Sequence, residues 1–100
     1  MQKNLLTNAG NGVTGKDKTV GRGGTLIISG NFDGGSVVFQ AKDPQTGNYA
    51  DIQTFTQASV ERLDLFDGGV SILQGRPDVT FRAKTTGGGG SMDVSMTLLG

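Results

Sequence analysis

The residues whose spacing comes nearest to a known chemistry lie in the stretch GNGVTGKD, where Gly10 is followed after four residues by Gly15 and Lys16. This order nearly matches a P-loop, which cradles phosphates and needs a Ser or Thr after the lysine to hold Mg²⁺. Asp17 stands at that position and would repel a phosphate. A P-loop also opens a helix, and the glycines after Asp17 do not favour one. The stretch therefore does not predict a nucleotide site.

A second candidate is the tetrapeptide Phe-Asp-Gly-Gly, which occurs at residues 32–35 and again at 66–69. Calcium loops gather several carboxylates at alternating positions, whereas each of these turns holds one, so no metal site is predicted. Asp-Gly is also the strongest short hairpin signal, because a type I′ turn needs positive φ at both central residues. We interpret Asp33 with Gly34, and Asp67 with Gly68, as two structural turns.

Catalysis lacks its usual parts. The chain has no His and no Cys, so the commonest general base and the thiolate nucleophile are both missing. The carboxylates fall mostly in turns or at outward strand positions, such as Asp51, Asp64 and Asp93. We expect no enzyme, no catalytic residue and no cofactor.

The charge balance bears on the kind of partner. Nine Lys and Arg residues are matched by nine Asp and Glu residues, so no general electrostatic attraction to nucleic acid or to an anionic membrane is expected. The first residues, MQKNLLTNAG, do not resemble a signal peptide, and no apolar run is long enough to span a membrane. We expect synthesis in a cytoplasm and a protein partner.

The pattern of apolar residues predicts strands. Gly makes up 18 of the 100 residues, more than twice the usual share of about 7%, and no stretch has a helical period. Apolar residues alternate with polar ones at Leu26, Ile28, Phe32, Val37, Phe39 and Ala41, at Val79, Phe81 and Ala83, and at Met92, Val94, Met96 and Leu98. We predict an all-β fold, a small antiparallel β-sandwich or jelly-roll-like barrel of about seven strands.

The turns also predict which strands pair. With Asp33-Gly34 as a two-residue loop, the flanking strands would form a hairpin in which Ile28 lies opposite Phe39. The second turn predicts a similar hairpin with Leu65 opposite Val70. The apolar faces of the two hairpins have different phases, so the repeat indicates the same turn chemistry and not a duplicated domain.

The N-terminal part looks different from the rest. Residues 8–24 contain six glycines and show neither a strand period nor a helical period. We predict an extended N-terminal arm over residues 1–23 and a β-sandwich domain over residues 24–100. Lys16, Lys18 and Arg22 give the arm a positive bias, which suits an acidic groove on a partner subunit; the alternative is a mobile terminus without a partner.

From Gly24 onward the order of features resembles small β-sandwich virion proteins of tailed bacteriophages. The resemblance covers about residues 24–99 and depends on the stretches GTLIISGNFDGGSVVFQ, PQTGNYADI, TFRAK, TTGGGG and SMDVSMTLL. The chain departs from that pattern in SILQGRPDV, which is longer than the expected tight turn, and it lacks the Trp that is frequent in the short middle strand.

The resemblance implies a structural role in a virion. The expected function is to decorate or stabilise the capsid through subunit contacts, with a major capsid protein or another virion protein as the partner. A homo-oligomer is expected, and the family likeness favours a trimer. The alternative is a tail- or head-associated binding module that contacts a host glycan.

Overall fold

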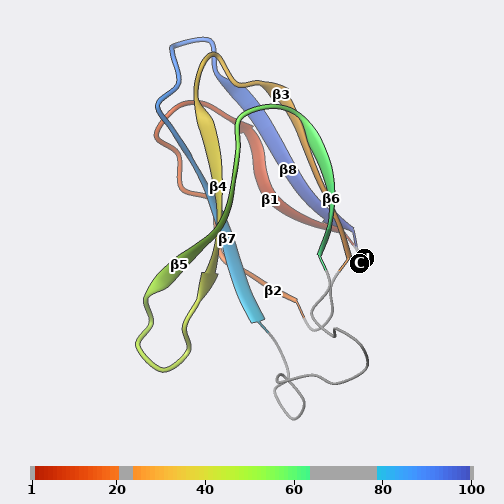
Figure 1. Ribbon diagram of the computed structural model, residues 1–100, viewed down its shortest axis with the longest axis vertical. Helices are drawn as coiled ribbons and strands as arrows, with labels where there is room; N and C mark the ends of the chain where they lie inside the picture. Colours follow the sequence, from red (N-terminus) through yellow and green to blue (C-terminus); the bar gives the residue numbers. More distant parts are fainter. Residues whose placement is uncertain (1, 21–23, 64–78, 100) are drawn as a thin grey trace.

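The computed structural model describes residues 2–20, 24–63 and 79–99 (Figure 1). Every regular element in these ranges is a β-strand, and the eight strands form two antiparallel four-stranded sheets. The prediction of a small all-β sandwich is therefore confirmed. The expected turn at Asp67 and Gly68, the hairpin around it and Arg22 lie outside the described residues.

Each sheet combines strands from the N-terminal and the C-terminal parts of the chain. Sheet A has the spatial order β1 (Gln2–Ala9), β8 (Asp93–Leu99), β3 (Gly24–Asn31) and β6 (Ser59–Leu63). Sheet B has the order β2 (Lys18–Val20), β7 (Val79–Thr86), β4 (Ser36–Lys42) and β5 (Tyr49–Phe55). The central strands are thus β8 and β3 in one sheet and β7 and β4 in the other, and the remaining four strands form the edges.

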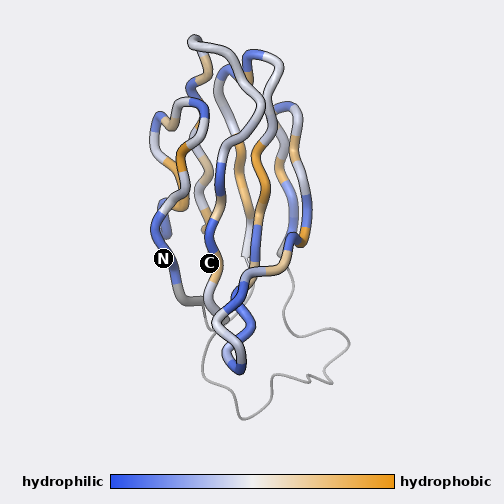
Figure 2. The backbone as a smooth tube through the Cα atoms, turned by 90° about the vertical axis from the view of Figure 1, so that its left-hand side faces the viewer, coloured by the Kyte–Doolittle hydropathy of each residue, from blue (hydrophilic) through white to orange (hydrophobic). Residues whose placement is uncertain are grey.

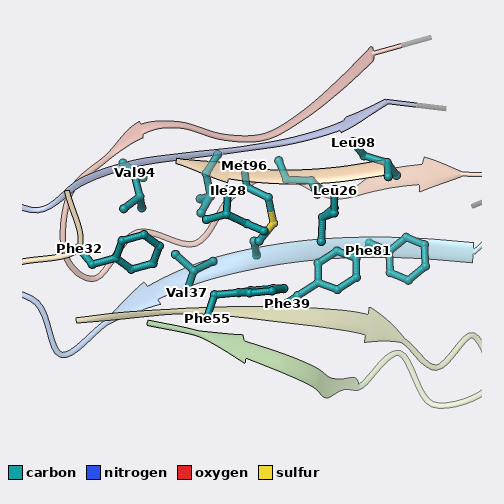
Figure 3. Packing of buried hydrophobic residues seen from close by; sticks show 14 of the residues in the cluster. Leu26, Ile28, Phe32, Val37, Phe39, Phe55, Phe81, Val94, Met96 and Leu98 are labelled. Atoms are coloured by element: carbon teal, nitrogen blue, oxygen red, sulfur yellow. The ribbon is translucent and has the colours of Figure 1, made fainter. Parts of the chain in front are cut away.

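The core lies between the inner faces of the central strands. Figure 3 shows side chains of β3 and β8 pointing toward those of β4 and β7, and Figure 2 shows the most hydrophobic stretches in mid-strand. Phe39 and Phe81 stack with their ring centroids 5.0 Å apart. The alternation predicted the buried side correctly for nearly all the inward positions; the fully buried side chains include Ile28, Val37, Phe39, Phe81, Val94, Met96 and Leu98.

The Asp33-Gly34 turn forms as predicted, but the hairpin does not. Asp33 and Gly34 have φ values of 47° and 79°, and the Gly35 amide donates a hydrogen bond of 2.8 Å to the Phe32 carbonyl. However, β3 pairs with β6 and β8, whereas β4 pairs with β5 and β7. The predicted pairing of Ile28 with Phe39 is wrong, because the turn carries the chain from one sheet to the other. Alternation defines the buried face of a strand and not its neighbour.

The expected N-terminal arm is not an arm over Gln2–Ala9. This segment is strand β1, which pairs with β8 at the edge of sheet A, and Leu5 and Leu6 are only 2% and 4% exposed. The predicted boundary between residues 23 and 24 is therefore wrong for this strand. The register of β1 shifts between Asn4 and Leu6 and again before Ala9. Such bulges put consecutive residues on the buried side and hide the period of two.

The Asp33-Gly34 turn is tied to the connection between β7 and β8. The Ser91 amide donates to Oδ2 of Asp33 at 2.9 Å, and the Gly89 amide donates to the Asp33 carbonyl at 3.1 Å. Nδ2 of Asn31 donates to the Ser91 carbonyl at 3.1 Å. A Cβ atom on Gly89 would lie 2.3 Å from Oδ2 of Asp33. The turn and the glycine-rich loop thus form one hydrogen-bonded end of the sandwich.

The first prediction concerns the turn. Gly34→Val should lower the free energy of unfolding by about 1–3 kcal/mol, because a β-branched residue is strained at positive φ. Gly90→Val is the matched control, since a Cβ atom on either glycine would have no neighbouring atom within 4 Å and only Gly34 has positive φ. Chemical denaturation of both variants measures the difference. Equal stabilities of the two variants would contradict the conformational cause.

Candidate functional site

An open groove of about 320 Å³ lies where the edge strands of the two sheets come together, between β1 and residues 13–18. We call it the β1–β2 groove. Its apolar lining consists of Leu5, Leu6, Ala9 and Val13, its neutral polar lining of Asn4, Thr7 and Thr14, and its cations are Lys16 and Lys18, with Gly15 between the walls. It is the candidate site that the described residues support best.

One wall of the groove is an open strand edge. The Gly15 amide donates to the Ala83 carbonyl and the Thr85 amide donates to the Val13 carbonyl, both at 2.8 Å. These bonds flank the bridge between Thr14 and Lys84. In an antiparallel ladder the amide and carbonyl of the intervening residue point to the opposite side. The backbone groups of Thr14 therefore point away from β7, toward the open side of the sandwich.

Gly15 brings the two walls together. A Cβ atom at this position would lie 2.1 Å from the Leu5 carbonyl oxygen and 3.2 Å from Cδ2 of Leu6. A contact of 2.1 Å is far inside van der Waals distance, so only glycine allows the edge of sheet B to approach β1 this closely. This close approach accounts for the second glycine of the P-loop-like stretch without any phosphate.

A one-residue irregularity in the edge of sheet B changes the face on which its lysines lie. Thr14 lies opposite Lys84 and Lys18 lies opposite Phe81, so four steps along one strand match three along the other. Without the extra residue Lys18 would share the face of Thr14, whereas with it Lys18 lies opposite the buried Phe81. Lys16 and Lys18 both line the groove, and Asp17 between them contacts Tyr49 on the outer side of sheet B. A bulge that reorients a side chain in this way is a common device at sheet edges.

The predicted partner-binding residues are thus only partly brought together. Lys16 and Lys18 line the same groove on this chain, instead of projecting from a free arm, and Arg22 lies outside the described residues. No ion pair or hydrogen bond joins either lysine to a carboxylate within residues 2–20, 24–63 and 79–99. Within this part of the chain, both positive charges are available to a partner.

A second group of polar side chains crosses the outer face of sheet B. The Arg82 guanidinium carbon lies 3.6 Å from the centroid of the Tyr49 ring, and Arg82 Nε donates to Gln40 Oε1 at 2.8 Å. Gln40 Nε2 in turn donates to Asp51 Oδ1 at 2.7 Å. We call Tyr49, Arg82, Gln40, Asp51 and Asp17 the polar belt. It buries Gln40 to 4% exposure although this residue faces away from the core.

The polar belt ends at the groove-bearing edge of sheet B. The hydrogen bond between the Tyr49 hydroxyl and the Asp17 carboxylate raises the pKa of Tyr49 above its ordinary value of 10.0; partial desolvation and the charge of Asp17 act in the same direction, and Arg82 opposes them. Tyr49 stands on β5 and Asp17 next to β2, so this contact links the two edges of the sheet. The belt could not be predicted from the sequence. Its residues are far apart in the chain and come together only because β5, β4, β7 and the segment before β2 lie side by side in a particular register.

Comparison with known proteins gives no relative: no protein-family model, no curated protein and no solved structure matches the chain. In the part of the chain that the structure describes, no three acidic residues come close enough to hold a metal ion. The described ranges also hold no helix of the length and apolar character needed to cross a membrane. The groove and the belt are therefore interpreted from their own geometry.

The second prediction uses the single Tyr of the chain, which has no Trp. Titration of tyrosine absorbance should give a pKa above 10 in the folded protein, and Asp17→Asn should lower it by removing the charged acceptor. Asp93→Asn, an exposed substitution on sheet A, is the control.

The raised pKa of Tyr49 also predicts how the stability of the fold depends on pH. Because the folded state holds the phenolic proton more tightly than the unfolded chain, whose Tyr has a pKa of about 10, the stabilisation is complete below about pH 10 and is lost as the pH rises through the folded pKa. Stability that falls equally with pH in Asp17→Asn and in the parent protein would contradict the assignment.

Proposed function

We propose that this protein is a structural component of a tailed-phage virion, which decorates or stabilises the capsid through subunit contacts and is not an enzyme. The virion setting rests on the resemblance of residues 24–99 to small phage β-sandwich proteins. The observation that carries the contact role is the β1–β2 groove, where Lys16 and Lys18 stand beside an apolar lining and an open strand edge.

The groove has the composition of a protein-contact surface. Leu5, Leu6 and Ala9 are buried in the folded chain, but they also line the groove, and Val13 is 40% exposed. The apolar surface that the groove offers to a partner is therefore mainly that of Val13, with Lys16 and Lys18 beside it, and exposed apolar groups next to charged ones are a common composition of an interface rim. An open strand edge favours pairing with another chain. The major capsid protein, or another virion protein, is the proposed partner.

The third prediction tests this contact. Recombinant protein should co-sediment in stoichiometric amounts with empty capsid shells assembled from the major capsid protein of the same phage. Lys16→Glu with Lys18→Glu should weaken this binding by at least about tenfold, because two attractive contacts become repulsive. Lys42→Glu with Arg62→Glu makes the same change of net charge at exposed sites away from the groove and should bind normally.

Two results would contradict the proposal. Equal loss in both double variants would show an effect of net charge and not of the groove. Absence of capsid binding, together with binding of the parent protein to a glycan array, would favour the alternative of a host-glycan binding module. The ring of Tyr49 is already stacked against Arg82, which leaves less of it for a sugar.

We also propose that the working form is a homo-oligomer, with the trimer favoured by the resemblance. The support is an apolar group on the outer face of sheet A. Ile27 lies opposite Val60 and next to Leu99 on the diagonal, and Val60 and Leu99 are 67% and 41% exposed. Exposed apolar groups across adjacent strands are typical of association surfaces.

The fourth prediction follows from this face. Light scattering should give an oligomeric mass for the parent protein and a monomeric mass for Val60→Lys, since a charge there would be desolvated on association. Ile52→Lys is the matched control, because Ile52 is 48% exposed on β5 of the other sheet, and it should remain oligomeric. A parent protein that is monomeric at every concentration, in solution and on the particle, would exclude this proposal.

A further inference from the structure

We infer that the β1–β2 groove binds an extended peptide segment of a partner subunit in which acidic residues alternate with apolar ones. This inference rests on the proposed function as a contact protein and names the chemistry of the contact. Three observations support it: the shape of the groove, the positions of Lys16 and Lys18 in its lining, and the open strand edge at Thr14.

The shape of the groove suits an extended chain. One wall is formed by the strand residues Asn4 to Thr7 and Ala9, and the other by the nearly extended residues 13–16 and Lys18. The two walls touch at Gly15, so an extended segment can lie along the outer side of residues 13–16, where the outward amide and carbonyl of Thr14 offer it two backbone hydrogen bonds. Addition of a strand to an exposed edge is a common mode of peptide recognition.

The side chains of the groove define the pattern of the occupant. Lys16 and Lys18 both line it and are two residues apart, a separation of about 6.5 Å in an extended chain. In a strand, residues i and i+2 have the same spacing and point to the same side. Two carboxylates at such positions can therefore face the two lysines, while an apolar residue of the segment can contact Val13, the exposed apolar residue of the lining.

The lining favours a peptide over a nucleic acid. Among the residues that the structure describes, no aromatic one lines the groove, so bases would find no ring there on which to stack, and stacking platforms are a regular part of single-strand binding sites. Two lysines are also few against a charged phosphate backbone, which is neutralised by rows of cations. Aliphatic contacts and two point charges match an acidic, partly apolar peptide better.

The experiment uses the whole chain and a fluorescent peptide of alternating Asp and Val, with peptides of alternating Thr and Val and of alternating Lys and Val as controls. Fluorescence anisotropy should show saturable binding of the acidic peptide only. The binding should weaken at least about tenfold in the Lys16→Glu, Lys18→Glu variant and should weaken with added salt. The Lys42→Glu, Arg62→Glu variant should bind as the parent protein does.

The location of binding is read by NMR. The acidic peptide should shift the amide signals of Thr14, Gly15 and Lys16 by more than those of β5 and β6. Equal binding of the neutral or the cationic peptide, or shifts confined to other strands, would overturn the inference. Competition by a single-stranded oligonucleotide with affinity equal to that of the acidic peptide would overturn it as well.

Failure of this inference can be distinguished from failure of the proposed function. If capsid binding depends on Lys16 and Lys18 but no acidic peptide binds, the contact role stands and the extended occupant is wrong. If the peptide binds at the groove and capsids do not, the occupant is right and the virion role is wrong.

Discussion

The packing of one sheet's inner face on the other is the constraint on which the rest of the structure depends. The chain has no Cys, so no disulfide holds the two sheets together, and apolar burial between β3 and β8 on one side and β4 and β7 on the other has to do so. The stacked rings of Phe39 and Phe81 are part of this core. Truncating a buried Phe typically costs about 3–5 kcal/mol, a large part of the roughly 5–15 kcal/mol that stabilises an ordinary domain.

Because the central strands are committed to this core, the features open to chemistry lie on the edge strands and outer faces. The groove lies between β1 and the edge of sheet B, and the polar belt joins β5 to the residues before β2. Both features depend on contacts at Gly15 and Asp17, which are neighbours of Lys16 on the two sides. The belt draws Asp17 to the outer face, and this removes from the groove the one carboxylate that would otherwise lie between its two lysines.

The sequence predicted the faces of the strands better than their partners. Alternation is a local property, and it correctly placed Ile28, Phe39 and Val94 in the core, but strand pairing depends on the whole chain. For this reason the Asp33-Gly34 turn was predicted correctly and its hairpin was not. Strand β1 was missed because its bulges bury Leu5 and Leu6 in succession. The second Asp-Gly turn lies outside the described residues and stays a prediction.

The P-loop-like stretch shows why residue types alone did not define the site. Gly10, Gly15 and Lys16 are the residues that a phosphate site would use. The structure explains the presence of two of them, Gly15 and Lys16, by other physical causes. Gly15 is required where two backbones approach within the space of a missing Cβ. Lys18 lies opposite the buried Phe81 because the edge strand holds an extra residue, and Lys16, two residues earlier, lines the same groove. The same short stretch thus closes the sandwich and presents two positive charges, and this coupling of packing to charge is the physical basis of the proposed contact surface.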